Sequence, residues 1–95
     1  MRCVFTPLAE SDLEAIGDYI ARDNPRRALT FIQELRRRCE QIADMPRAAA
    51  LRPELGAGVR VVTFGRYLIC YAERDDQVVI ERIVHGARSL RNLFG

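Results

Sequence analysis

The side chains in this sequence that could do chemistry are one histidine, His85, and the arginines placed around it. Arg60 and Arg66 fall near the ends of two apolar runs, and Arg88 follows the last run. A guanidinium group binds phosphate oxygens through paired hydrogen bonds, and an imidazole can transfer protons near neutral pH. Brought together, these four side chains could cleave RNA. The alternative is structural: each arginine lies at the edge of a sheet, and His85 caps the last strand.

Other reaction types have less support in the residues. A nucleophilic triad would have to be built on His85, and Ser89, four residues later, has no glycine-rich loop beside it to bind an oxyanion. The stretch 56–58, Gly-Ala-Gly, lacks the further glycine, the preceding strand and the following helix of a nucleotide-binding loop. We interpret this stretch as a turn that enters a strand.

The cysteines and the absence of lysine further limit the reactions and cofactors that this chain could support. Cys3, Cys39 and Cys70 are far apart, and each falls in an apolar segment, so we expect reduced core residues. With one histidine in the chain, a zinc site would need ligands from three distant segments. We therefore expect no metal ion and no cofactor. All fifteen basic residues are arginine, so no lysine amine is available as an acid or a base.

Size and composition predict one small domain over residues 1–95. No apolar run approaches the ~18 residues of a membrane span, and the N-terminus lacks the layout of a signal peptide. We therefore expect a cytoplasmic protein with no membrane contact. Residues 1–24 carry two arginines against five acids, whereas residues 25–95 carry thirteen arginines against eight acids. This basic part could meet an acidic partner or a nucleic acid.

The elements that would position these side chains follow from the periodicity. Residues 2–6 are rich in strand formers and predict a short strand. Apolar residues at three- and four-residue steps then predict helices over 8–23 and 25–44, each with a polar cap and a proline at its start. Because almost no loop separates the two helices, they should fold back as an antiparallel hairpin.

Three strand-like runs, GVRVVTF, RYLICYAER and QVVIERIVH, follow a loop over 46–58. The separators between the runs are short, so they predict antiparallel hairpins and a three-stranded meander. The expected fold is α+β, in the order β-α-α-β-β-β, with a short C-terminal tail. In the middle run both faces of the strand carry apolar side chains, yet a helical hairpin can cover only one face. We expect the surplus apolar surface to bind a partner, through Phe64, Tyr67, Ile69 and Tyr71.

The strings FTPLAESDLEAIGDYIARDNPRRALTFI, RPELGAGVRVVTFGRYLICYAERDD and VVIERIVHGARSL, in this order, resemble the RelE/ParE toxin superfamily. They are most similar to its ParE, or plasmid stabilisation, branch, and the resemblance spans almost the whole chain. It implies the fold derived above. It also implies a toxin that a small ParD-like antitoxin neutralises in a hetero-oligomeric complex, and the apolar surface just described is the expected antitoxin-binding site.

The resemblance implies two possible activities, and the fold does not decide between them. Toxins similar to ParE poison DNA gyrase by binding, whereas those similar to RelE cut messenger RNA on the ribosome with basic residues over the sheet, often with a tyrosine near the C-terminus. Arg60, Arg66 and His85 match such nuclease positions loosely, and Arg88 lies beside them. However, glycine follows the histidine and the tail has no tyrosine. This depleted set favours a gyrase inhibitor that catalyses no reaction.

On that interpretation the C-terminal tail contacts the target. Its residues combine guanidinium groups with apolar anchors, a mixture typical of binding hot spots. The expected target-binding residues are Arg88, Leu90, Arg91, Leu93 and Phe94. The alternatives are a RelE-like, ribosome-dependent mRNA endoribonuclease and a degenerate member that only engages its antitoxin.

Overall fold

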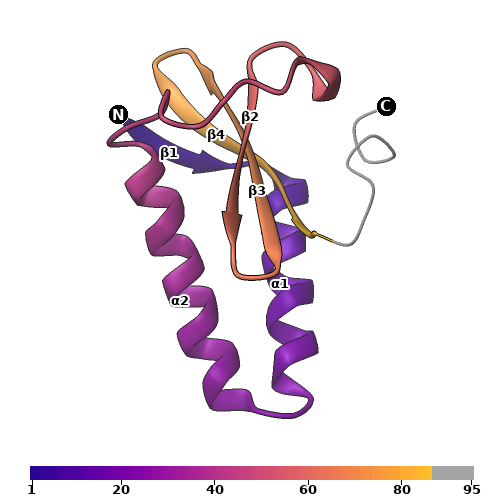
Figure 1. The fold of residues 1–95 in the computed structure, drawn as a ribbon. Coiled ribbons are helices and arrows are strands. Elements are labelled where there is room, and N and C mark those ends of the chain that lie inside the picture. Colours follow the sequence, from indigo (N-terminus) through magenta and orange to yellow (C-terminus); the bar gives the residue numbers. More distant parts are fainter. Residues whose placement is uncertain (87–95) are drawn as a thin grey trace.

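The computed structural model describes residues 1–86 of the 95-residue chain. A short strand, two helices and three further strands follow one another, which confirms the predicted α+β order (Figure 1). A 3₁₀ turn, Pro53–Leu55, interrupts the long loop before the second strand. The elements are β1 (Arg2–Phe5), α1 (Pro7–Ala21), α2 (Pro25–Ile42), β2 (Val59–Phe64), β3 (Tyr67–Arg74) and β4 (Gln77–His85).

Both helices begin at the residues that the sequence indicated. The Thr6 hydroxyl accepts a hydrogen bond from the Ala9 backbone N–H at 3.0 Å, and Pro7 occupies the first turn of α1. The Asn24 side chain accepts from the Arg27 N–H at 3.1 Å at the start of α2. Each cap satisfies a backbone donor that has no partner inside the helix. The start of each helix is therefore fixed, and a short connection joins the two helices.

The four strands form one mixed sheet in the order β1-β4-β3-β2. The pairs β2–β3 and β3–β4 are antiparallel, as predicted. Both residues of the Asp75-Asp76 turn have positive φ angles, 51° and 59°, as a tight two-residue hairpin requires. The first and last strands also pair, in parallel, with Arg2 opposite Gln77 and Phe5 opposite Ile80. The sequence did not predict this pairing.

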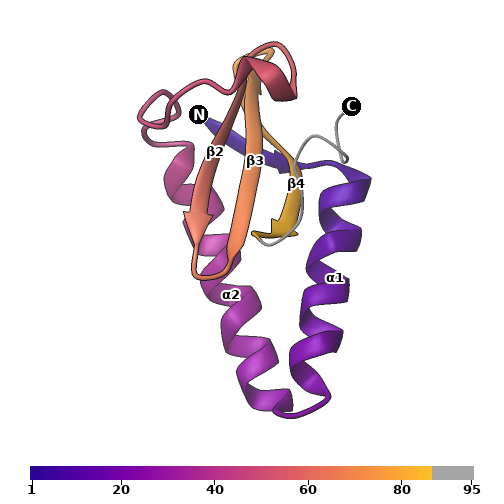
Figure 2. The ribbon, with the colours of Figure 1, turned by 45° about the vertical axis from the view of Figure 1, so that its right-hand side comes forward.

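The helical hairpin packs against one face of the sheet. In Figures 1 and 2 the helices run side by side, and their connecting end extends well beyond the strands. The contact between the layers is a core of aliphatic side chains with Tyr71 at its centre. Its members that are less than 3% exposed include Leu35, Cys39, Ile69 and Ile80. The hydrophobic stripes of the two helices thus cover the face of β3 that carries Ile69 and Tyr71.

This placement corrects the expected partner surface. Ile69 is 0% exposed and Tyr71 is 1% exposed, because their face of β3 is the one that the helices bury. The opposite face of β3 is not open either, since Cys70 and Ala72 are also 0% exposed. The alternation correctly indicated that both faces of β3 are apolar, but the expectation that one of them stays open at these positions was wrong.

Candidate functional site

A groove opens where the C-terminal end of β4 meets α1 and the turn between β2 and β3. We call it the aromatic groove, and its volume is about 460 Å³. Its polar side chains are Tyr19, Arg66, Tyr67 and His85, together with Asp12. Apolar residues line the rest of it, namely Ala15, Ile16, Ile83 and Val84.

Backbone pairing brings three of these groups together. In the register of β3 and β4, Tyr67 lies opposite His85, and their rings meet edge to face with centroids 5.6 Å apart. The Gly86 N–H donates to the Arg66 carbonyl at 2.7 Å, which holds the end of β4 beside the turn. Gly65, with φ of 57°, makes that tight turn possible. Arg66, Tyr67 and His85 therefore share one end of the sheet.

Tyr19 reaches the groove from the helical layer. It follows the buried Ile16 by three residues on α1, so it lies on the same side of the helix near its end. Its side chain is 66% exposed. The pKa of Tyr67 is raised, first by burial and then by the nearby Tyr19, while Arg66 opposes the shift. Tyr67 therefore stays a neutral phenol at physiological pH, and both tyrosines line the groove.

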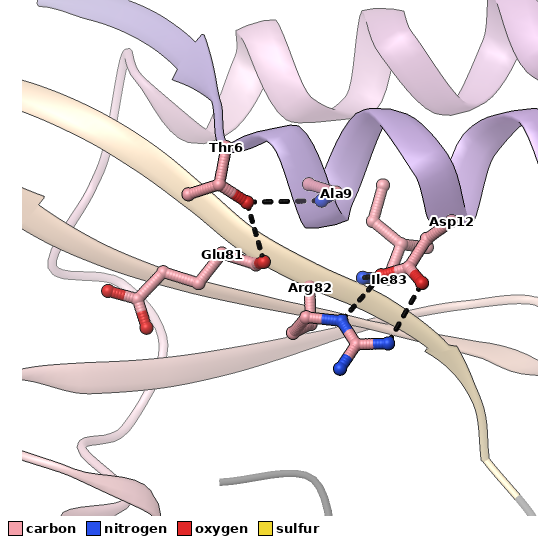
Figure 3. A network of polar contacts seen from close by, with 6 residues as sticks. All are labelled: Thr6, Ala9, Asp12, Glu81, Arg82 and Ile83. Carbon is pink, nitrogen blue, oxygen red and sulfur yellow. Dashed lines mark hydrogen bonds and ion pairs between the residues drawn. The ribbon is translucent and has the colours of Figure 1, made fainter.

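A polar clamp fixes α1 against β4 beside the groove (Figure 3). The Asp12 carboxylate accepts from Arg82 Nε at 2.8 Å, from Arg82 Nη2 at 2.9 Å and from the Ile83 N–H at 2.9 Å. At the start of α1, the Thr6 hydroxyl donates to the Glu81 carbonyl at 2.8 Å. The hydrogen bond that Arg82 donates to Asp12 also raises the pKa of Arg82. The acid that lines the groove is therefore already neutralised by a cation.

The residues predicted for a nuclease do not all gather here. Arg66 and His85 lie together in the aromatic groove, whereas Arg60 lies at the start of β2, about 20 Å from the turn along the strand. The Arg60 guanidinium donates to the carbonyls of Ala49 and Arg47 and holds the long loop. It therefore has a structural contact in place of the predicted phosphate contact. Arg88 lies outside the described residues.

Sequence reasoning missed the two tyrosines as members of this site. It considered Tyr67 for partner binding and did not consider Tyr19. The available signal was the spacing of Tyr19, three residues after Ile16 on the sheet-facing side of the helix. If the sheet covered this end of the helix, an aliphatic residue would be expected at position 19. A tyrosine there, with an apolar ring and a polar hydroxyl, instead indicates the edge of the contact between helix and sheet.

Two of the predicted antitoxin-binding residues remain accessible. Phe64 and Tyr67 are half-buried and pack on Phe31 of α2, with ring centroids at 5.5 Å and 5.7 Å. The Arg27 guanidinium lies over the other side of this cluster, 5.2 Å from the Phe31 ring centroid. Of the surface predicted for the antitoxin, the part that stays accessible is therefore the border between α2 and the β2–β3 turn.

A second and larger hollow lies between the two helices. We call it the hairpin groove; its volume is about 950 Å³, and its lining residues in the described part of the chain all belong to α1 and α2. Gly17 faces Ile32 across the two helices, and a Cβ added there would make an ordinary van der Waals contact with the Ile32 side chain at 3.5 Å. Leu29, 69% exposed, borders the groove. The acids along its α1 side are Glu10, Glu14 and Asp18.

The described part of the chain contains neither a metal-ligand cluster nor a membrane-spanning helix. Among residues 1–86, no three His, Cys, Asp or Glu side chains gather in a way that could hold a metal ion. Over the same range, no helix is both long and apolar enough to cross a membrane. Cys39 and Cys70 are unpaired and buried, as predicted, and Cys3 is half-buried.

A solved structure described as a chromosomal ParDE TA system from P. aeruginosa matches with a TM-score of 0.78 and 25% sequence identity, over 90% of this chain and 95% of that one. The model of the family described as ParE toxin of the type II toxin-antitoxin system parDE matches residues 3–90. The chain belongs to the ParE toxin family. No curated protein matches it.

Proposed function

We propose that this ParE-family toxin inhibits DNA gyrase by binding it, and that a cognate ParD-like antitoxin neutralises it. The observation that carries the proposal is the family match over residues 3–90. Membership of the ParE toxin family implies an antitoxin partner. That gyrase is the target is our inference beyond the family match. Since gyrase acts on the chromosome, the protein would work in the cytoplasm.

The separation of the nuclease candidates supports inhibition without catalysis. A ribonuclease transition state needs both charge neutralisation and proton transfer at one place. In this chain Arg60 is committed to loop carbonyls, which leaves Arg66 as the guanidinium of the aromatic groove. One cation and one imidazole make a weak cleavage site.

We place target binding on the tail, as its composition indicates. Its residues offer two guanidinium groups and three large apolar side chains within seven positions. Such a mixture supplies charge-assisted hydrogen bonds and buried anchors at protein interfaces. The residues are Arg88, Leu90, Arg91, Leu93 and Phe94.

We place the antitoxin on the helices. The hairpin groove offers an apolar floor with Leu29 at its border and two acids along α1, Glu14 and Asp18, whereas Glu10 forms an ion pair with Arg36. An amphipathic antitoxin helix with basic residues at its edge would complement this surface. The border formed by Phe64 and Tyr67 would extend the interface toward the sheet.

Gyrase supercoiling and ribosomal translation, assayed separately with the purified protein, test the proposal. We expect inhibition of supercoiling with accumulation of cleaved DNA, and no cleavage of messenger RNA. His85→Ala should change gyrase inhibition by less than a factor of about three, because an exposed side chain outside the interface contributes little. Codon-positioned mRNA cleavage that His85→Ala abolishes, with supercoiling unaffected, would contradict the proposal.

A second candidate function is ribosome-dependent mRNA cleavage. The observation that favours it is the convergence of Arg66, Tyr67 and His85, which places a cation and two groups able to carry protons in one groove. If neither gyrase nor the ribosome is affected while the antitoxin still binds, the chain is a non-toxic member that only engages its partner.

A further inference from the structure

The aromatic groove has the properties of a nucleotide site, although the gyrase proposal gives it no role. Its volume, about 460 Å³, falls in the range of small-molecule sites. One wall is the exposed Tyr19 on α1, and the other is Tyr67, whose ring is held between Phe31 and His85. The groove therefore offers phenol rings from two different elements to a flat ligand.

Aromatic walls of this kind bind nucleobases when the base is not already stacked in a duplex. Every base has a π face, so stacking on tyrosine is strong and tolerant of sequence. A base paired within a double helix cannot enter a recess between a helix and a strand. The geometry thus selects single-stranded nucleic acid over double-stranded nucleic acid.

The charges at the groove favour a phosphate. Arg66 lies exposed at its mouth, and no acid forms an ion pair with it within residues 1–86. Asp12 is the acid among the lining residues, and its charge is compensated by Arg82 and the Ile83 N–H. Repulsion of an anion by Asp12 is therefore weak, while the Arg66 guanidinium can bind two phosphate oxygens.

We propose that the aromatic groove binds one nucleotide of a single-stranded nucleic acid, with the base against Tyr19 and the phosphate on Arg66 and His85. This binding requires no cleavage and does not depend on the gyrase proposal. Because only one arginine takes part, the affinity is modest and falls as salt is added.

Fluorescence anisotropy with the full chain and labelled short oligothymidylate, at low and moderate salt, tests the site. We expect Tyr19→Ala to weaken binding at least about five-fold through lost stacking. Tyr19→Phe, which keeps the ring, should bind as the unchanged protein does. Arg66→Ala should weaken binding and lower the salt dependence by about one phosphate contact. Tyr19 and Arg66 are both exposed, so these variants should fold normally.

Matched controls separate the groove from general basic charge. Arg26→Ala removes an exposed arginine from α2, and Leu29→Ala shortens an exposed side chain; both should leave binding unchanged.

Competition by thymidine monophosphate supports a site for base and phosphate together. Absence of binding at low salt would overturn the proposal, as would equal losses in Arg26→Ala and Arg66→Ala. Equal competition by inorganic phosphate and by a duplex of the same sequence would also overturn it. Tighter binding of oligouridylate than of oligothymidylate would support the proposal with RNA as the ligand, and the reverse would support it with DNA.

Discussion

Asp12 and Arg82 are joined by two parallel hydrogen bonds across the boundary between α1 and β4. The strand β1 pairs with β4 only as far as Ile80, so the next part of β4 has no neighbouring strand on that side. The side chain of Asp12 takes over this role, because it also accepts from the Ile83 N–H. A helix side chain thus continues the edge pairing of the sheet where β1 ends.

Asp12→Ala should therefore lower the free energy of unfolding by about 2–3 kcal/mol. The change leaves a largely buried guanidinium and a backbone N–H without their acceptor, since the Arg82 side chain is 18% exposed. Denaturation with urea measures the effect. Asp18→Ala, at an exposed position of the same helix, is the control and should change stability by less than about 0.5 kcal/mol. Equal effects of the two variants would show that the clamp contributes nothing.

Leu29→Asp should weaken antitoxin binding at least about ten-fold and leave the stability of the free toxin nearly unchanged. Leu29 is exposed in the toxin alone, so the change costs the free toxin little, but in the complex it replaces an apolar contact with a carboxylate that must lose its water. Isothermal titration with the antitoxin measures the affinity. Leu51→Asp, at an exposed position in the loop, is the control. If both variants bind as well as the unchanged toxin, the antitoxin lies elsewhere.

Removal of residues 89–95 should abolish gyrase inhibition and toxicity in cells while antitoxin binding persists. The deletion takes away one of the two guanidinium groups and the apolar anchors proposed for the target, and it keeps every lining residue of both grooves that lies within residues 1–86. Supercoiling assays and titration with the antitoxin report the two functions independently. Retention of full gyrase inhibition by the shortened chain would place the target-binding surface within residues 1–88.

Alkaline pH should destabilise the fold through its buried thiols. Burial raises the pKa of Cys39 from 9.0 to about 12 and that of Cys70 to about 11. Above pH 9 the unfolded chain loses these protons and the folded chain keeps them, so stability falls as pH rises toward the folded values. The slope is at most about 1.4 kcal/mol per pH unit for each thiol. Cys39→Ala should have a shallower slope, and an unchanged slope would assign the loss to other groups.

The sequence predicted the elements well because their signals are local. Thr6-Pro7 and Asn24-Pro25 define helix starts by capping chemistry, and Asp75-Asp76 defines a hairpin by backbone conformation. The pairing of β1 with β4 is different in kind. A strand of four residues does not encode which distant edge it joins, so the sheet order followed only from the structure.

Only those residues of the candidate site whose positions follow from the three-stranded meander could be predicted from the sequence. Arg66 and His85 come together because two short hairpins place them at one end of the sheet. Tyr19 was missed because helical periodicity does not encode how a helix is positioned along a sheet. Arg60 was wrongly grouped with them, since its partners are loop carbonyls that no pattern in the sequence indicates.

The parallel pairing of β1 with β4 also has a consequence for how the protein folds. The hydrogen bond between Thr6 and Glu81 spans 75 residues, so the sheet can close only after β4 has been synthesised. Contacts between residues so distant in sequence slow folding, because the entropy of closing a long loop is lost before the contacts form. The helical hairpin can form early from local contacts, while the aromatic groove is completed only when β4 is in place. A ribosome that stalls before β4 would release a fragment without the aromatic groove.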